Sequence, residues 1–336
     1  VPYGWSWLGD HGGRRVQLLR IAAIGSFGAA VVLWGTSSYA AVAIVTTLLF
    51  AFNGGVIPLS EAALARHLAT AQGIDAGRYG RVRVWGSIGF IVVVLTAGPV
   101  FEHLGIAAFP YVLALLYAAL VIATHRLPST PESAHVDGPV PPVLALLRDP
   151  AVAWFFASIF FTVLAHTSAY AFLSLYMDAL GYGKTAVGLL WATAVVFEIV
   201  FFWTQGHWFE RLSAHGWLKI ASGVTVLRFV ATALGASSVP VLAVAQASNA
   251  LTFAAHHAAC TSLLHRHFPG RLRGRGQALY STLGYGIPGV IGGVGGGWLV
   301  GRFGFPAVYW AAVGAASLGM ICAYRVAGVA RLRTSP

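Results

Sequence analysis

Two ionisable side chains inside strongly apolar stretches are the first candidates for chemistry. Glu198 lies within an apolar stretch at about 185–205, and Arg228 lies midway along another at about 218–236. A charge at the centre of a bilayer costs at least about 2.5 kcal/mol, so such residues are usually kept for function. We expect Glu198 and Arg228 to form a proton site or to bind substrate. The alternative is a buried structural ion pair that ties two helices together.

A polar stripe runs along a third apolar stretch, at about 239–263. Its members recur at spacings of three and four residues and therefore share one helical face: Gln246, Asn249, Phe253, His256 and Cys260. Such a face must contact protein or water. We expect the polar members Gln246, Asn249 and His256 to contact substrate. Hydrogen bonding between helices, worth about 0.6 kcal/mol per contact, explains the stripe equally well.

A histidine stands in a fourth stretch, at about 151–177. Thr162, His166 and Tyr170 follow one another at i+4 positions and share a helical face. An unperturbed histidine titrates near neutrality, which suits a proton relay. The sequence therefore makes His166 and Tyr170 candidates for proton coupling or substrate binding. A histidine that only packs and hydrogen-bonds is the equally good alternative.

A bend is predicted in the stretch at about 39–62, where Asn53 is followed by Gly54, Gly55 and Pro58. A side chain at a bend can line a cavity, so Asn53 is a further candidate for substrate contact. Glu61, one turn beyond the proline, lies near the end of the stretch and is expected to pair with loop arginines.

The elements that carry these residues have a composition unusual for a soluble protein. The chain has 336 residues, of which 57% are hydrophobic and 9% charged, and its mean hydropathy is +0.74. Soluble domains carry about 25% charged residues. A run of about 20 apolar residues spans the hydrocarbon core as a helix, and lipid cannot satisfy open backbone groups. The runs are too long for barrel strands, which predicts an all-α membrane protein of about ten transmembrane helices. The predicted segments are 17–36, 39–62, 84–101, 105–124, 151–177, 185–205, 218–236, 239–263, 277–300 and 305–326.

The connections between these segments alternate in charge. Nearly all basic residues fall in every second connection, and only Lys184 and Arg302 lie on the other side. The positive-inside rule places the Arg-rich side in the cytoplasm, so both ends of the chain are predicted to be cytoplasmic. An even number of spans agrees with this arrangement. The net charge of +11 therefore indicates membrane topology rather than nucleic-acid binding.

A proline-rich connection at about 125–150 divides the chain. It is predicted to be a linker between a first part, 1–124, with four helices and a second part, 151–336, with six. The two cysteines, Cys260 and Cys322, both lie in apolar segments and have no metal-ligand spacing. No catalytic motif is present, so neither an enzyme, a metal nor a cofactor is predicted.

An acidic residue followed by basic residues recurs about 200 residues apart, in the strings LGDHGGRR at 8–15 and GHWFER at 206–211. The first string resembles the signature loop of the major facilitator superfamily. Two further strings, YGRVRVWGSIG at 79–89 and FPGRLRGRGQ at 268–277, resemble the phenylpropionate permease-like branch, which is related to nucleoside–proton symporters. The stretch from 174 to 191 resembles the same branch.

This resemblance implies a twelve-helix bundle that works as a secondary transporter by alternating access. The expected partners are a bilayer, a small organic solute (an aromatic acid or a nucleoside-like compound) and protons, in a symporter of the bacterial inner membrane that is monomeric. It also implies that cytoplasmic loop residues form a gate: Asp10, Arg14, Arg15, Arg81 and Arg83.

Two alternatives remain open at this point. The first part has four predicted helices where the family has six, which suggests an N-terminally truncated chain that lacks the first two helices. A non-transporting membrane protein is then one alternative. The other is a membrane enzyme or haem protein that uses His166, His256 and His257, with two histidines ligating the haem.

Overall fold

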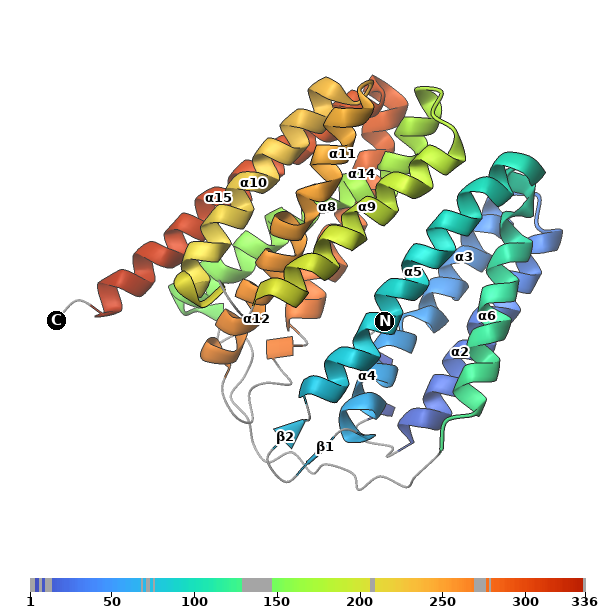
Figure 1. The fold of residues 1–336 in the computed structure, drawn as a ribbon, viewed down its shortest axis with the longest axis horizontal. Helices are drawn as coiled ribbons and strands as arrows, with labels where there is room; N and C mark the ends of the chain where they lie inside the picture. Colours follow the sequence, from blue (N-terminus) through green and yellow to red (C-terminus); the bar gives the residue numbers. More distant parts are fainter. Residues whose placement is uncertain are drawn as a thin grey trace. The chain divides into compact units, whose positions relative to one another are not determined.

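The computed structural model describes residues 4–5, 8–9, 14–67, 69–70, 73–74, 76–128, 147–205, 209–268, 276–277 and 279–334. These residues are almost entirely helical (Figure 1), which confirms the predicted all-α membrane protein. Besides the turns between helices, the described residues include one short antiparallel hairpin. Its strands, β1 (Ala69–Thr70) and β2 (Gly73–Ile74), have two residues each, and Ala69 pairs with Ile74.

Nine stretches of the described residues are long and apolar enough to cross a membrane: Arg15–Gly35, Tyr39–Glu61, Trp85–Leu104, Ile106–His125, Pro150–Ala179, Lys184–Thr204, Ala214–Gly235, Tyr280–Phe303 and Phe305–Val329. Each coincides with a predicted segment. The remaining predicted segment, 239–263, is also helical but is divided into α11 (Val239–Ala247), the π-helix η5 (Ala250–Ala255) and α12 (His256–His267). A π-turn inside a helix is rare and is frequently found at functional sites.

The chain folds into two compact units. Unit 1 comprises residues 1–89 and 99–138, and unit 2 comprises residues 90–98 and 139–336, so the boundary cuts the long helix α5 (Ala76–Leu104). The predicted linker at 125–150 lies mostly outside the described residues, since 129–146 are not among them.

Unit 1 is built around α2 (Arg15–Val32), which packs against α3 (Tyr39–Asn53), α4 (Val56–His67) and α6 (Phe109–His125). Two short 3₁₀ turns, η1 (Leu33–Gly35) and η2 (Ile106–Ala108), complete it. Small residues allow the close packing: a Cβ on Gly25 would lie 2.3 Å from the Phe52 ring. Arg20 donates from Nε to the carbonyl of Thr124 at 3.3 Å and from Nη2 to that of Leu127 at 2.7 Å, so a basic side chain satisfies carbonyls at and just beyond the C-terminal end of α6.

The predicted bend after Asn53 is confirmed as a break between two helices. Helix α3 ends at Asn53, Gly54 and Gly55 form a turn, and α4 begins at Val56. A Cβ on Gly55 would lie 2.7 Å from the Trp5 ring, so the glycine makes room for that indole. The indole Nε1 of Trp5 donates to the carbonyl of Ala51 at 2.8 Å, which holds the ring against the break.

Unit 2 surrounds α8 (Pro150–Ala179), which packs against α14 (Ile287–Phe303), α15 (Phe305–Thr334) and the π-helix η7 (Tyr280–Gly286). Helices α9 (Lys184–Thr204) and α10 (Ala214–Gly235) pack on η5, and a short 3₁₀ turn, η4 (Phe209–Arg211), precedes α10. Asp149 caps α8 by accepting from the backbone of Ala151 at 2.8 Å, with Pro150 in the first helical position. Exposed apolar side chains such as Trp203 and Leu234 cover the helices, as expected for a surface in lipid.

Some glycines of α14 pack against a neighbouring helix, and others have open space beside them. A Cβ on Gly292 would lie 2.7 Å from Cβ of Thr167 on α8, whereas a Cβ on Gly293 would meet nothing within 4 Å. We therefore expect Gly292→Ala to destabilise the protein by about 1–3 kcal/mol through overpacking. The neighbouring Gly293→Ala is the matched control and should leave stability unchanged or slightly higher. Thermal unfolding of both variants in detergent measures the difference, and equal behaviour would contradict the α8–α14 contact.

Candidate functional site

Arg228 is buried in the interior of unit 2. Its side chain is 5% exposed, and it projects from α10 toward the polar face of α11 and η5. Nη2 donates to Oε1 of Gln246 at 2.7 Å, and Nη1 donates to Oγ1 of Thr252 at 2.8 Å. Nη1 also donates to Oδ1 of Asn249. The guanidinium is thus paired with three uncharged groups on one neighbouring helix, which stabilises a buried charge.

Asn249 connects Arg228 to Glu198. Its Oδ1 accepts from Arg228, and its Nδ2 donates to Oε1 of Glu198 on α9. Because a guanidinium has only donors and a carboxylate only acceptors, this orientation of the amide is dictated by its two partners. The predicted Glu198–Arg228 pair is therefore a three-membered chain with an asparagine at its centre. The sequence placed all three residues in the site but did not predict their order.

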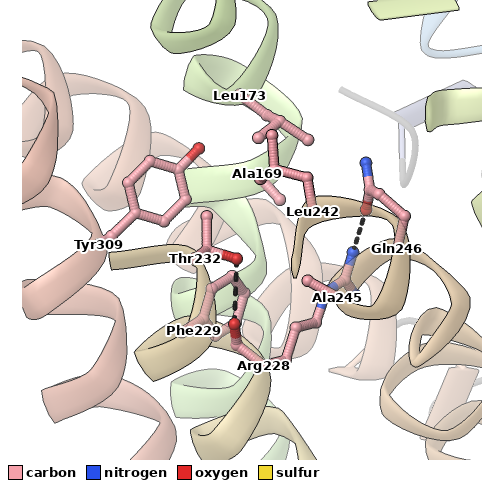
Figure 2. Close-up of a pocket in the computed structure, with 9 residues that line it drawn as sticks. All are labelled: Ala169, Leu173, Arg228, Phe229, Thr232, Leu242, Ala245, Gln246 and Tyr309. Atoms are coloured by element: carbon pink, nitrogen blue, oxygen red, sulfur yellow. Dashed lines mark hydrogen bonds between the residues drawn. The ribbon is translucent and has the colours of Figure 1, made fainter. Parts of the chain in front are cut away.

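A small cavity of about 10 Å³ lies beside Arg228 (Figure 2). Figure 2 shows Gln246 accepting from the guanidinium, and Thr232 donating to the Arg228 carbonyl at 3.0 Å. The Nε2 of Gln246 is buried without a hydrogen-bond partner among the described residues. The volume suffices for about one water molecule and is far too small for an organic solute. Arg228 lines this cavity, but its guanidinium is held by the three groups of the neighbouring helix and contacts no space large enough for a solute.

His166 is buried on α8, with 4% of its surface exposed. Its Nδ1 lies 2.8 Å from the carbonyl oxygen of Thr162, so Nδ1 carries the proton in that bond. The other nitrogen, Nε2, is buried and has no hydrogen-bond partner among the described residues. The Phe229 ring packs edge-on against the imidazole at 5.5 Å between centroids. In the neutral ring, Nε2 is therefore an acceptor that this part of the chain leaves unsatisfied.

Tyr170 lies one turn beyond His166, with 51% of its surface exposed. Its ring stacks on Trp191 of α9, at 6.2 Å between centroids and 15° between planes. The Nε1 of Trp191 donates to Oγ of Ser174 at 3.0 Å. The rings of His166 and Tyr170 lie side by side, 6.2 Å apart between centroids, and their part in proton coupling or substrate binding stays a prediction.

The histidines of α12 contact different partners. His256 is buried, and Sγ of Cys260 lies 3.6 Å from its Nδ1. His257 bonds through Nδ1 to Oη of Tyr280 at 3.1 Å, and Tyr280 Oη lies 3.2 Å from Oη of Tyr285. No group of three or more His, Cys, Asp or Glu that could hold a metal occurs in the part of the chain that the structure describes.

The predicted gate and Asn53 belong to unit 1 or to residues that are not described. Asp10 lies outside the described residues, and Arg81 and Arg83 lie in α5 with side chains that are likewise outside them. Arg14 and Arg15 stand at the start of α2, and Asn53 is the last residue of α3. Their roles remain predictions.

Sequence reasoning missed several members of the site. Thr252 continues the i+3 spacing from Gln246 through Asn249, so that spacing was a signal that could have found it. Ser174 likewise follows Tyr170 at i+4 on α8. The pairing of Tyr280 with Tyr285 had no such signal, because the two tyrosines meet within the π-helix η7.

Comparison with known proteins finds a matching family and two similar bacterial transport proteins. A family model described as "MFS_1 like family" matches residues 2–311. Maltose permease of Geobacillus stearothermophilus is 30% identical over 315 residues, covering 91% of this chain and 76% of that protein. The probable 3-phenylpropionic acid transporter of Escherichia coli (strain K12) is 28% identical over 287 residues, covering 81% and 71%.

A solved structure shares the fold. The nucleoside transporter NupG matches with a TM-score of 0.74 and 16% identity, covering 97% of this chain and 85% of that one. Its D323A mutant matches with a TM-score of 0.79, covering 97% and 86%. At this identity the likeness concerns the arrangement of the helices.

Proposed function

This chain belongs to the MFS_1 like family, so it is a multi-pass membrane transporter of the major facilitator superfamily and not an enzyme, and we propose that it couples the transport of a small organic solute to protons. In this proposal, the parts 1–124 and 151–336 rock about a midplane site and expose it alternately to the two sides of the membrane. The stretch 125–150 is the cytoplasmic linker between them.

The proposal of proton coupling rests on the two hydrogen bonds that link Glu198 to Asn249 and Asn249 to Arg228. Glu198 is the residue that takes up and releases the proton. Asn249 donates to its carboxylate and is held in that orientation by Arg228, so the ionised form has a fixed partner. Protonation removes the charge from Glu198 and so lowers the cost of enclosing it in a low-dielectric interior. Loading of the proton can therefore favour the closing of the site.

The other candidate residues have further roles in this proposal. We propose that His166 offers its unsatisfied Nε2 to a donor group of the solute or to a proton, and that Tyr170 borders the same region. Gln246 and His256 support the helix that carries Asn249, and Asn53 of unit 1 is a separate candidate for contact with the solute. The gate proposed on the cytoplasmic side consists of the loop residues Asp10, Arg14, Arg15, Arg81 and Arg83.

The solute proposed is an aromatic acid or a nucleoside-like compound. The names of two relatives refer to 3-phenylpropionic acid and to nucleosides, and another refers to maltose. Aromatic side chains at Tyr170 and Phe253 suit a solute with a ring. We further propose that the protein resides in a bacterial inner membrane, with both ends of this chain in the cytoplasm, as its arginine distribution indicates.

Uptake into proteoliposomes tests this function. The purified full-length protein is reconstituted, a proton gradient directed inward is imposed, and accumulation of radiolabelled 3-phenylpropionate, uridine and maltose is measured. We expect at least one solute to accumulate above its external concentration, and a protonophore to abolish that accumulation. Equilibration of a solute without accumulation would contradict proton coupling. The absence of any uptake across these solutes would contradict the proposed solute classes.

A further inference from the structure

The rings of Tyr170 and Trp191 stack on each other, and a hydrogen bond to Trp191 adds to their packing. The two rings come from different helices, α8 and α9, and lie nearly parallel, 15° apart. The hydrogen bond from Trp191 Nε1 to Ser174 Oγ, at 3.0 Å, fixes the direction of the indole. Since Ser174 lies one turn from Tyr170 on α8, the same helix holds both the ring and the polar anchor. A preorganised aromatic surface loses little freedom when a ligand binds to it.

Part of this pair is accessible. Tyr170 is 51% exposed although its ring stacks on that of Trp191. Glu198 lies seven residues, or two turns, from Trp191 along α9, so the two side chains share one face of that helix. A carboxylate is costly in contact with lipid, which indicates that this side of the two helices faces water or protein. An exposed aromatic face in such a place is available to a solute.

We propose that Tyr170 and Trp191 form a stacking platform for a planar ring of the transported solute, with Ser174 as the residue that positions Trp191. The proposal rests on the proposed function in one respect, namely that the chain carries a small organic solute. It assigns the flat, unsaturated ring of the proposed solute, an aromatic acid or a nucleobase derivative, to a particular pair of side chains. Offset stacking favours flat rings because their π-systems can approach face to face with a lateral shift.

Matched pairs of probes test the platform without any proton gradient. The first pair is 3-phenylpropionate and 3-cyclohexylpropionate, and the second is uridine and 5,6-dihydrouridine; within each pair, only the planarity of the ring differs substantially. Binding to the purified full-length protein in detergent is measured by calorimetry. We expect one planar probe to bind roughly three- to tenfold more tightly than its saturated partner.

Three variants assign this preference to the platform. Trp191→Leu should remove the difference between planar and saturated probes, whereas Trp191→Phe should keep most of it. Ser174→Ala frees the indole and should reduce the preference by a smaller factor. Trp203→Leu is the matched control, because Trp203 lies on the same helix with 80% of its surface exposed, and it should leave the preference unchanged. Unfolding temperatures without ligand identify any variant that fails to fold.

The outcomes separate this proposal from that of proton coupling. Equal binding of the planar and saturated probes, or the absence of binding by both planar probes, would overturn the platform, as would an equal loss of preference in Trp191→Leu and Trp203→Leu. None of these results depends on Glu198 or on a gradient. Conversely, a ring preference that is lost in Trp191→Leu, reduced in Ser174→Ala and kept in Trp191→Phe and Trp203→Leu would support the platform even if accumulation proved independent of protons.

Discussion

Glu198→Gln is expected to abolish proton-driven accumulation while leaving exchange of solute across the membrane intact. The amide has nearly the same shape as the carboxylate, and its oxygen can still accept from Nδ2 of Asn249, the contact that the structure shows for Glu198. It cannot take up or release a proton in the accessible pH range. With one proton per solute, a gradient of one pH unit sustains about tenfold accumulation, because one pH unit corresponds to 1.36 kcal/mol. The variant should equilibrate the solute and accumulate none.

Two measurements in proteoliposomes check this result. Net uptake under an inward proton gradient reports coupling, and exchange of labelled for unlabelled solute at equal pH reports binding and movement of the site. Glu102→Gln is the control, since it removes an exposed carboxylate near the end of α5 and should retain both activities. If Glu198→Gln accumulated solute like the unaltered protein, Glu198 would not be the proton site.

Arg228→Met is expected to be the most destabilising single change in unit 2. Methionine fills part of the volume but leaves the acceptors of Gln246, Asn249 and Thr252 without the guanidinium, in a region where each residue is at most 4% exposed. Removing one member of a buried charged network typically costs about 3–5 kcal/mol. For a chain of this size, the apparent unfolding temperature should fall by roughly 10 °C.

A control and a rescue make this prediction specific. Arg302→Met removes an exposed arginine at the end of α14 and should leave the unfolding temperature unchanged within about 1–2 °C. Adding Gln246→Leu and Thr252→Val to Arg228→Met replaces polar partners with apolar ones and should recover part of the loss. An unaltered unfolding temperature for Arg228→Met would show that the hydrogen bonds of the guanidinium contribute little to the fold.

The sequence was sufficient to predict the class of the molecule and its helices. Long apolar runs have one stable solution in lipid, so the all-α membrane fold followed from composition and spacing alone. The resemblance of the strings at 79–89 and 268–277 to the phenylpropionate permease-like branch agrees with the family match and with the relative from Escherichia coli.

The internal order of the site was less accessible. Glu198, Arg228 and Asn249 were recognised as polar residues in apolar surroundings, but helical periodicity does not tell which helices adjoin one another. The placement of Asn249 between two opposite charges depends on the packing of α9 and α10 on η5, which is a tertiary property. The open ring of Tyr170 could not be predicted either, since the exposure of a side chain depends on neighbours far apart in the sequence.

The π-helix η5 between Gln246 and His256 affects how the chain should be aligned with its relatives. A π-turn closes its backbone ring over five residues where an α-turn uses four, so it accommodates one additional residue without lengthening the helix by a full step. A homologue with an uninterrupted α-helix there would need one residue fewer to present the same two faces. A gap-free alignment anchored before the π-helix would then pair His256 of this chain with the residue that is equivalent in space to His257. The gap in such an alignment should be placed within 250–255.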